Sequence, residues 1–223
     1  MHKQLGISLV SMLIGLMISS LCILVSLTLY KDMVHVTAES KIGAMHDGQL
    51  ATAMLTLQLE VQTAGYGIEA ADTDDVVVVD GDNEIGLRWR YHNGTEFKCR
   101  GFLETQQLIN GTQYRVLKMQ SSTGSCNDTT PLANMTYSDE TIIARWPVIN
   151  ELTTYLAGKA ANDRTLLDIT RIDNSTCSPF GATASDAHLM VQVTSPSAAL
   201  LNGAANVALN SYTYCLPNTA PAS

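Results

Sequence analysis

Four cysteines in the polar part of the chain could form disulfides: Cys99, Cys126, Cys177 and Cys215. The fifth, Cys22, lies inside an uncharged apolar run. An even number of cysteines outside such a run indicates an oxidising compartment and two disulfides. Of the three possible pairings, we favour Cys99–Cys126 with Cys177–Cys215, because each bridge closes a local loop. Each would stabilise the fold by about 3–4 kcal/mol.

Catalytic and metal-binding patterns are missing from the rest of the sequence. It has no G-x-S-x-G elbow, H-E-x-x-H helix, P-loop or C-x-x-C pair, so we expect neither an enzyme nor a cofactor. The histidines are scattered without metal-ligand spacing, which favours surface or packing roles. They are His2, His35, His46, His92 and His188.

An acidic segment is the one candidate for a metal site. Its carboxylates are Asp72, Asp74, Asp75, Asp80, Asp82 and Glu84. Asp80, Asp82 and Glu84 could supply the oxygen ligands that calcium prefers, although they lack the order of an EF-hand loop. We favour the alternative of two solvated acidic loops, and therefore predict no metal.

The charge balance excludes nucleic-acid binding as the main purpose of the fold. The formal net charge is -8 and the densest cationic run is short: Arg88, Arg90, Lys98 and Arg100. Phosphate binding needs clustered basic side chains. Basic residues at alternate positions are more typical of the solvated face of a strand, so we expect no sequence-specific nucleic-acid binding.

The N-terminus indicates a membrane anchor. Residues 7–30 contain no charged side chain, and as a helix they would be about 36 Å long, enough to cross a bilayer. This run is too long for a signal peptide and is followed by no small-x-small cleavage site. Lys3 before it favours a cytoplasmic N-terminus and an exported remainder, which agrees with the cysteines.

The segment Gly6-Ile7-Ser8-Leu9-Val10-Ser11-Met12-Leu13-Ile14-Gly15-Leu16 resembles the N-terminal signal of type IV prepilins. The resemblance implies that residues 1–6 are a leader, that a prepilin peptidase cuts after Gly6, and that Ile7 becomes an N-methylated mature N-terminus. Ile7 replaces the usual Phe of the family.

Ser11 departs from the family, which has Glu at this position to pair with the N-terminal amine of a neighbouring subunit. A carboxylate in hydrocarbon is costly unless it is paired, whereas a serine hydroxyl can bond to its own helix. Two interpretations remain open. Ser11 is tolerated drift in a low-copy subunit, or it marks a subunit at the fibre tip.

Residues 31–66 predict a continuation of the helix with one apolar face. Residues of that face recur every three or four positions: Leu50, Met54, Leu57, Val61 and Ala64. Gly65 and Gly67 would end the helix. Ala64-Gly65-Tyr66 also resembles the segment that closes this helix in minor pilins of the PilW kind.

Residues 67–223 predict a β-rich globular domain. Strand patterns occupy 76–79, 87–91, 96–103, 114–120, 189–193 and 207–215, and a short helix is expected within 146–156. Asn93-Gly94 and Asn110-Gly111 are turn signals, the first between two strands. We expect a loop over 121–136. Sequons at Asn93, Asn110, Asn127, Asn134 and Asn174 would matter in a secreted eukaryotic chain.

Together these features predict an α+β, pilin-like fold, in which a long N-terminal helix packs against an antiparallel sheet domain. The resemblance implies a minor pilin of the bacterial inner membrane with a periplasmic domain, later part of the pilus fibre. Its partners would be other minor pilins, the major pilin and the prepilin peptidase. Its role would be to prime pilus assembly and so support twitching, adhesion or DNA uptake.

Two alternatives remain. A minor pseudopilin of type II secretion would carry the same N-terminal signal. A signal-anchored adhesive or receptor ectodomain would keep its leader and use the sequons.

Overall fold

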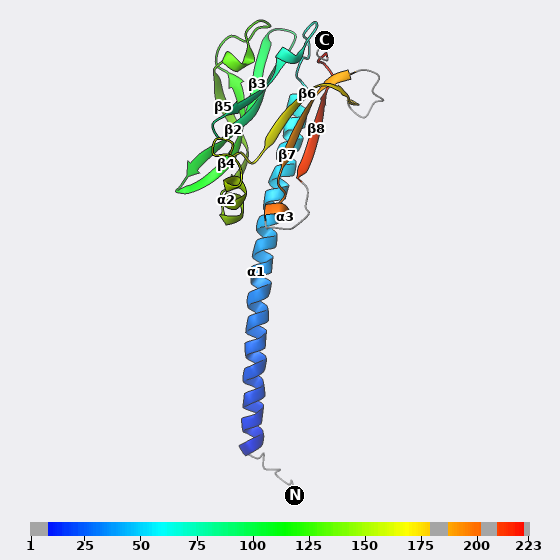
Figure 1. Ribbon diagram of the computed structural model, residues 1–223. Coiled ribbons are helices and arrows are strands. Elements are labelled where there is room, and N and C mark those ends of the chain that lie inside the picture. Colours follow the sequence, from blue (N-terminus) through cyan, green and yellow to red (C-terminus); the bar gives the residue numbers. More distant parts are fainter. Residues whose placement is uncertain (1–8, 179–186, 202–208, 221–223) are drawn as a thin grey trace. The chain divides into compact units, whose positions relative to one another are not determined.

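The computed structural model describes residues 9–178, 187–201 and 209–220 (Figure 1). The chain divides into two compact units, residues 1–45 and 46–223. One long helix contributes to both units, and all strands belong to the second.

Helix α1 spans Leu9–Val61. Its predicted apolar face is confirmed, because Leu50, Met54, Leu57 and Val61 are each at most 2% exposed. The helix ends five residues earlier than the predicted boundary at residue 66. Residues 62–67 instead form hydrogen-bonded turns, in which Gly65 and Gly67 adopt positive φ angles of 75° and 69°.

A five-stranded antiparallel sheet has the simple order β1-β2-β3-β4-β5. Its strands are β1 (Val76–Gly81), β2 (Glu84–His92), β3 (Phe97–Ile109), β4 (Thr112–Ser122) and β5 (Tyr137–Pro147). Both Asn-Gly signals are hairpin turns. In the second, Asn110 and Gly111 have φ angles of 49° and 81°, as a two-residue turn of the primed type requires.

A second antiparallel sheet, of three strands, has the order β6-β7-β8. It contains β6 (Asp168–Thr176), β7 (Ala187–Ser195) and β8 (Asn210–Leu216). The predicted antiparallel β-rich domain is confirmed, and it contains two sheets. The local sequence pattern predicts neither β5 nor β6, because Ser138–Ile142 of β5 are all exposed and only Ile169 of β6 is a buried apolar residue.

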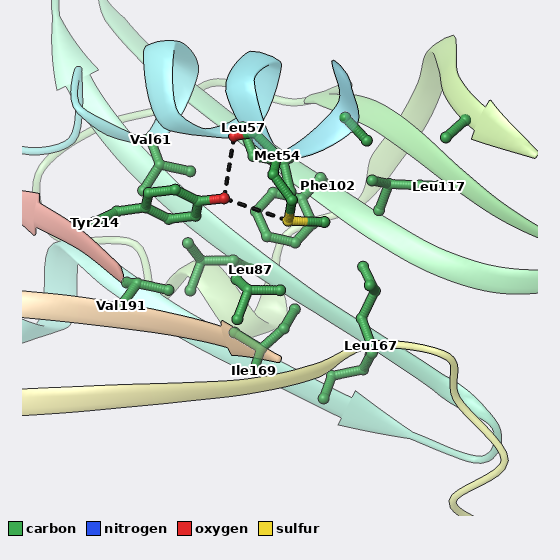
Figure 2. Close-up of a cluster of buried hydrophobic side chains, with 14 of the residues drawn as sticks. Met54, Leu57, Val61, Leu87, Phe102, Leu117, Leu167, Ile169, Val191 and Tyr214 are labelled. Atoms are coloured by element: carbon green, nitrogen blue, oxygen red, sulfur yellow. Dashed lines mark hydrogen bonds between the residues drawn. The ribbon is translucent and has the colours of Figure 1, made fainter. Parts of the chain in front are cut away.

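The core lies between α1 and the two sheets (Figure 2). Met54, Leu57 and Val61 of α1 face Leu87, Phe102 and Leu117 of the larger sheet and Ile169, Val191 and Tyr214 of the smaller one. The Tyr214 hydroxyl donates to the main-chain oxygen of Met54 at 3.0 Å. Burying this hydroxyl costs little because it is hydrogen-bonded.

Short helices complete the structure. A short helix is present where one is predicted. Helix α2 (Asn150–Ala157) ends one residue beyond the predicted region, 146–156. Helix α3 is Ala198–Leu201, and two 3₁₀ turns, η1 (Thr73–Asp75) and η2 (Leu132–Asn134), lie in the connections. The first two residues of the predicted last strand, 207 and 208, lie outside the described residues.

Candidate functional site

The apolar half of α1 has the composition and length of a membrane span. From Leu9 to Tyr30 the helix carries no charge, and its leucine, isoleucine, valine and methionine side chains are between 53% and 76% exposed. These 22 residues rise by about 33 Å, enough for the hydrocarbon core of a bilayer. Among the described residues α1 is the one helix that could cross a membrane.

Three hydroxyl groups in this segment form hydrogen bonds within the helix. The Ser20, Ser26 and Thr28 hydroxyls donate to the main-chain oxygens of Met17, Cys22 and Val25, each at 2.8 Å. Because water is absent from hydrocarbon, such internal bonds make the segment compatible with lipid. Ser11 lies on this exposed part of α1, whereas Gly6 and Ile7 lie outside the described residues.

The turn after α1 is held against the edge of β2. The Gly65 amide donates to the main-chain oxygen of Arg90, and the His92 amide donates to that of Tyr66. A Cβ atom on Gly65 would lie 2.5 Å from the main-chain oxygen of Asn218, and one on Gly67 would overlap that of His92. Glycine is required at both positions for its φ angle and for this close approach.

The structure contains the two local disulfides that the sequence analysis favours. Cys99 of β3 is bonded to Cys126, and Cys177 is bonded to Cys215 of β8. Cys22 is free and exposed on α1.

Residues 123–136, which we call the clasp, connect β4 to β5 and are held at several points. Besides the Cys126 bridge, Arg90 donates to the main-chain oxygens of Asn127 and Thr130 at 2.6 and 3.2 Å. Arg88 donates to those of Leu132 and Ala133, and its guanidinium lies 4.3 Å from the Tyr137 ring centre. The clasp is thereby fixed over the face of the sheet that points away from α1.

The residues of the basic run, Arg88, Arg90, Lys98 and Arg100, all bind partners within the chain. In addition to its clasp contacts, Arg90 pairs with Asp75 at 2.6 Å, and both side chains are buried. Arg100 bridges Glu60 of α1 and Glu140 of β5, and Lys98 pairs with Glu96. Arg88, Arg90 and Arg100 are therefore structural cross-links, whereas Lys98 forms a local, exposed pair with Glu96.

The acidic segment also has structural roles. Asp72 and Asp75 form a capping box around η1. Burial raises the pKa of Asp75 despite its bond to the Asp72 amide and its pairing with Arg90. Glu84 accepts a hydrogen bond from Thr105. Within the described ranges no three His, Cys, Asp or Glu side chains come close enough to hold a metal ion, and that includes Asp80, Asp82 and Glu84.

A surface pocket of about 420 Å³ lies between the acidic segment and the clasp. Glu69, Asp72, Asp74 and Asp128 line it, together with Arg90. Arg90 already contacts Asp75, the main-chain oxygen of Asp74 and the clasp. Its guanidinium group therefore stabilises the fold.

Two of the histidines and two of the sequon asparagines form local or packing contacts. His46 Nε2 lies 3.2 Å from the main-chain oxygen of Pro196, and His92 Nδ1 accepts from the Gly94 amide. The Asn93 and Asn127 side chains accept main-chain amides two and three residues ahead, which gives each asparagine a role in a turn.

A buried ion pair that the sequence pattern does not indicate links the neighbouring strands β3 and β4. Glu104 and Arg115 are fully buried and 2.5 Å apart. The Glu104 carboxylate also accepts the amides of Leu166 and Leu167 at 2.8 and 2.7 Å. No local sequence pattern could have identified Glu104 as buried. Its partners are Arg115 of β4 and the connection before β6, which begins to contact it at Leu166, 62 residues away.

Lys159 and Tyr155 lie beside the same connection, the segment that leads into β6. Lys159 Nζ donates to Asp168 at 2.6 Å and to the main-chain oxygen of Thr165 at 3.0 Å. Burial, followed by the charges of Asp168 and Glu104, raises the pKa of Tyr155 to about 12. The phenol therefore stays neutral at physiological pH.

No protein family, characterised protein or solved structure matches the chain. The structure itself places it among mixed α+β proteins, with one long N-terminal helix that can span a membrane and a disulfide-bonded domain of antiparallel sheets.

Proposed function

We propose that this chain is a minor subunit of a bacterial type IV pilus, similar to minor pilins of the PilW kind. The observation that carries the proposal is the prepilin-like segment Gly6–Leu16 at the head of a helix that changes character along its length. The first half of α1 is apolar on every side, and the second half buries one face in a β-rich domain.

The two disulfides support export of that domain, because such bonds persist in oxidising compartments. In this proposal α1 anchors the chain in the inner membrane until the subunit joins other minor pilins and the major pilin. The β-domain then lies in the periplasm and provides the specific contacts of the assembly. The role is structural: the subunit primes fibre growth and is incorporated into the fibre.

The experiment is an intact-mass and N-terminal peptide measurement on the chain isolated from native membranes. The expected mature chain begins at Ile7, lacks residues 1–6 and carries one added methyl group. Gly6→Val is the matched variant, and it should retain the leader. A wild-type chain that begins at Met1 would refute the proposal, and added glycan mass would then favour an anchored ectodomain.

Deletion of the gene separates the two pilin-like roles. Loss of surface fibres is expected for a minor pilin. Loss of protein secretion with fibres intact would instead assign the chain to type II secretion as a pseudopilin.

A further inference from the structure

The turn between β2 and β3 surrounds the side chain of Asn93 with hydrogen-bonding groups from the neighbouring residues. We propose that Asn93 is a modification site, at which the folded chain converts the asparagine into aspartate and isoaspartate without a separate enzyme. The inference goes beyond the proposed function and does not depend on it.

The reaction joins the Asn93 side chain to the next main-chain nitrogen. The Gly94 nitrogen loses its proton and attacks Cγ of Asn93, so that a new C–N bond forms and the side-chain nitrogen leaves as ammonia. Water then opens the cyclic imide. Opening at Cγ gives aspartate, and opening at the main-chain carbon gives isoaspartate. The attack is intramolecular and gains from proximity, and water is the only other reactant.

His92 supplies a base for the attacking nitrogen. The Gly94 amide donates to His92 Nδ1 at 3.2 Å. An amide nitrogen becomes a nucleophile as it loses its proton, and a neutral imidazole is the commonest general base in proteins. The His92 ring is oriented in turn by Phe97, whose ring it meets edge-on with the centroids 4.9 Å apart.

The Asn93 side-chain oxygen lies among three donors. It accepts from the Thr95 amide at 3.0 Å, from the Thr95 hydroxyl at 2.8 Å and from the Glu96 amide at 3.0 Å. These donors polarise the carboxamide and stabilise the oxyanion that forms when the Gly94 nitrogen attacks Cγ. The bonds that shape the turn therefore also form an oxyanion hole.

Asn110 provides a matched comparison within the same chain. It is followed by Gly111 and Thr112, so the tripeptide Asn-Gly-Thr occurs at both positions, and both asparagines are exposed. Among the described residues, none forms a hydrogen bond with the Asn110 side chain or accepts one from the Gly111 amide. The two sites thus share their local sequence and differ in the groups around it.

Asn127 provides a second comparison. Its side-chain oxygen accepts from the Thr129 amide, the Thr129 hydroxyl and the Thr130 amide. The next residue is Asp128 instead of glycine, and within the described ranges no group accepts its amide. Asn127 therefore has the donors without the base, and only Asn93 of these three asparagines has both.

The modification changes the turn beside the junction of α1 with the sheet. The His92 amide donates to the main-chain oxygen of Tyr66 at 2.7 Å, and Asn93 is the next residue. Either product adds a negative charge next to Glu96, and isoaspartate also lengthens the main chain of the turn. Because the reaction releases ammonia, the change proceeds in one direction with the age of the chain.

Peptide mass spectrometry on the purified full chain in detergent tests the inference. Loss of the side-chain amide is followed at Asn93 and Asn110 in the same molecules, in the folded chain and in the chain unfolded by urea. Folding should raise the ratio of the Asn93 rate to the Asn110 rate by about tenfold or more, because a general base and an oxyanion hole each accelerate such a step. An equal or smaller ratio in the folded chain would overturn the inference.

The products test the role of Gly94. A cyclic imide opens to both aspartate and isoaspartate, and peptides that contain them separate on chromatography. We expect both at position 93. Aspartate without isoaspartate would mean that water attacked the carboxamide directly, and it would overturn the proposed route.

Three variants test the groups around Asn93. His92→Phe keeps an aromatic ring beside Phe97 but has no nitrogen, and it should lower the Asn93 rate by about tenfold or more. Thr95→Val removes the hydroxyl donor and should lower the rate by about threefold or more, whereas Thr95→Ser keeps the donor and should not.

The Asn110 rate is the internal control and should be the same in all three variants. An Asn93 rate that His92→Phe or Thr95→Val leaves unaltered would overturn the role given to that group. A mature chain that begins at Met1 would refute the pilin proposal and leave this test unaffected.

Discussion

At the scale of single residues, Glu104 is a buried carboxylate on which three hydrogen-bond donors converge. Its carboxylate accepts from Arg115, Leu166 and Leu167, and it is fully buried. The three donors compensate for the desolvation of its charge. Glu104 thus fixes the connection before β6 against β3.

Glu104→Ala should lower the free energy of unfolding by about 3–5 kcal/mol, because it leaves the buried Arg115 charge without its carboxylate and two buried amides without their acceptor. Thermal unfolding of the full chain in detergent measures this as a fall of about 10 °C or more in Tm. Glu96→Ala, which removes an exposed glutamate paired with Lys98, is the control and should change little. Equal Tm values for the two variants would contradict this role.

The lowered pKa of Asp139 predicts a small dependence of the free energy of unfolding on pH. A hydrogen bond from Gln120, followed by one from Lys118, holds the pKa of Asp139 below its ordinary value of 3.8. The folded chain therefore binds this proton less tightly than the unfolded chain. The stabilisation is present above pH 3.8 and is lost as the pH falls through the lowered pKa.

Denaturant titrations between neutral and acidic pH measure this dependence. Because Asp139 is about half exposed, the contribution should be below about 1 kcal/mol. Asp139→Asn should flatten the acid end of the stability curve. A variant with the same curve as the wild type would show that the pairing contributes nothing.

At the scale of elements, the turn after α1 decides how the helix joins the sheet. Gly67→Ala should destabilise by about 1–3 kcal/mol more than Gly94→Ala, because its Cβ would overlap main-chain atoms of β2. Gly94 is the matched control: its φ is also positive, at 96°, and a Cβ there meets no atom within 4 Å. Equal losses, measured by chemical unfolding, would mean that only backbone strain matters at Gly67.

The disulfides act at the same scale, on the clasp and on β8. Replacing Cys99 and Cys126 together by serine should lower the free energy of unfolding by about 3.5 kcal/mol, since the bridge closes a loop with a sequence separation of 27. Cys22→Ser, which removes the free thiol, should have no effect. Limited proteolysis should then cut the clasp first, and an unaltered digestion pattern would contradict its anchoring by Cys126.

At the scale of the whole molecule, the apolar half of α1 is long and apolar enough to span a membrane. Ile18→Arg places a charge within the apolar run and should cost about 3 kcal/mol of insertion free energy, whereas Ile18→Leu should cost nothing. Carbonate extraction of membranes measures the retained fraction. Equal retention of the two variants would argue against a span centred on this run.

The sequence by itself determined the elements that depend on local pattern. The uncharged run of α1 and its later face at Leu50–Val61 follow from composition and from the 3.6-residue period. The Asn-Gly turns follow from positive φ angles that few residues tolerate. The local cysteine pairing that we favoured needs only a short loop, and it is the pairing in the structure.

Only the tertiary structure decided the rest, because those features depend on groups distant in sequence. Arg88 and Arg90 look like the solvated face of a strand until the clasp folds over them. Glu104 looks exposed until Leu166 and Leu167 bring their amides to it. The division into two sheets arises from long-range strand pairing, which no local period encodes.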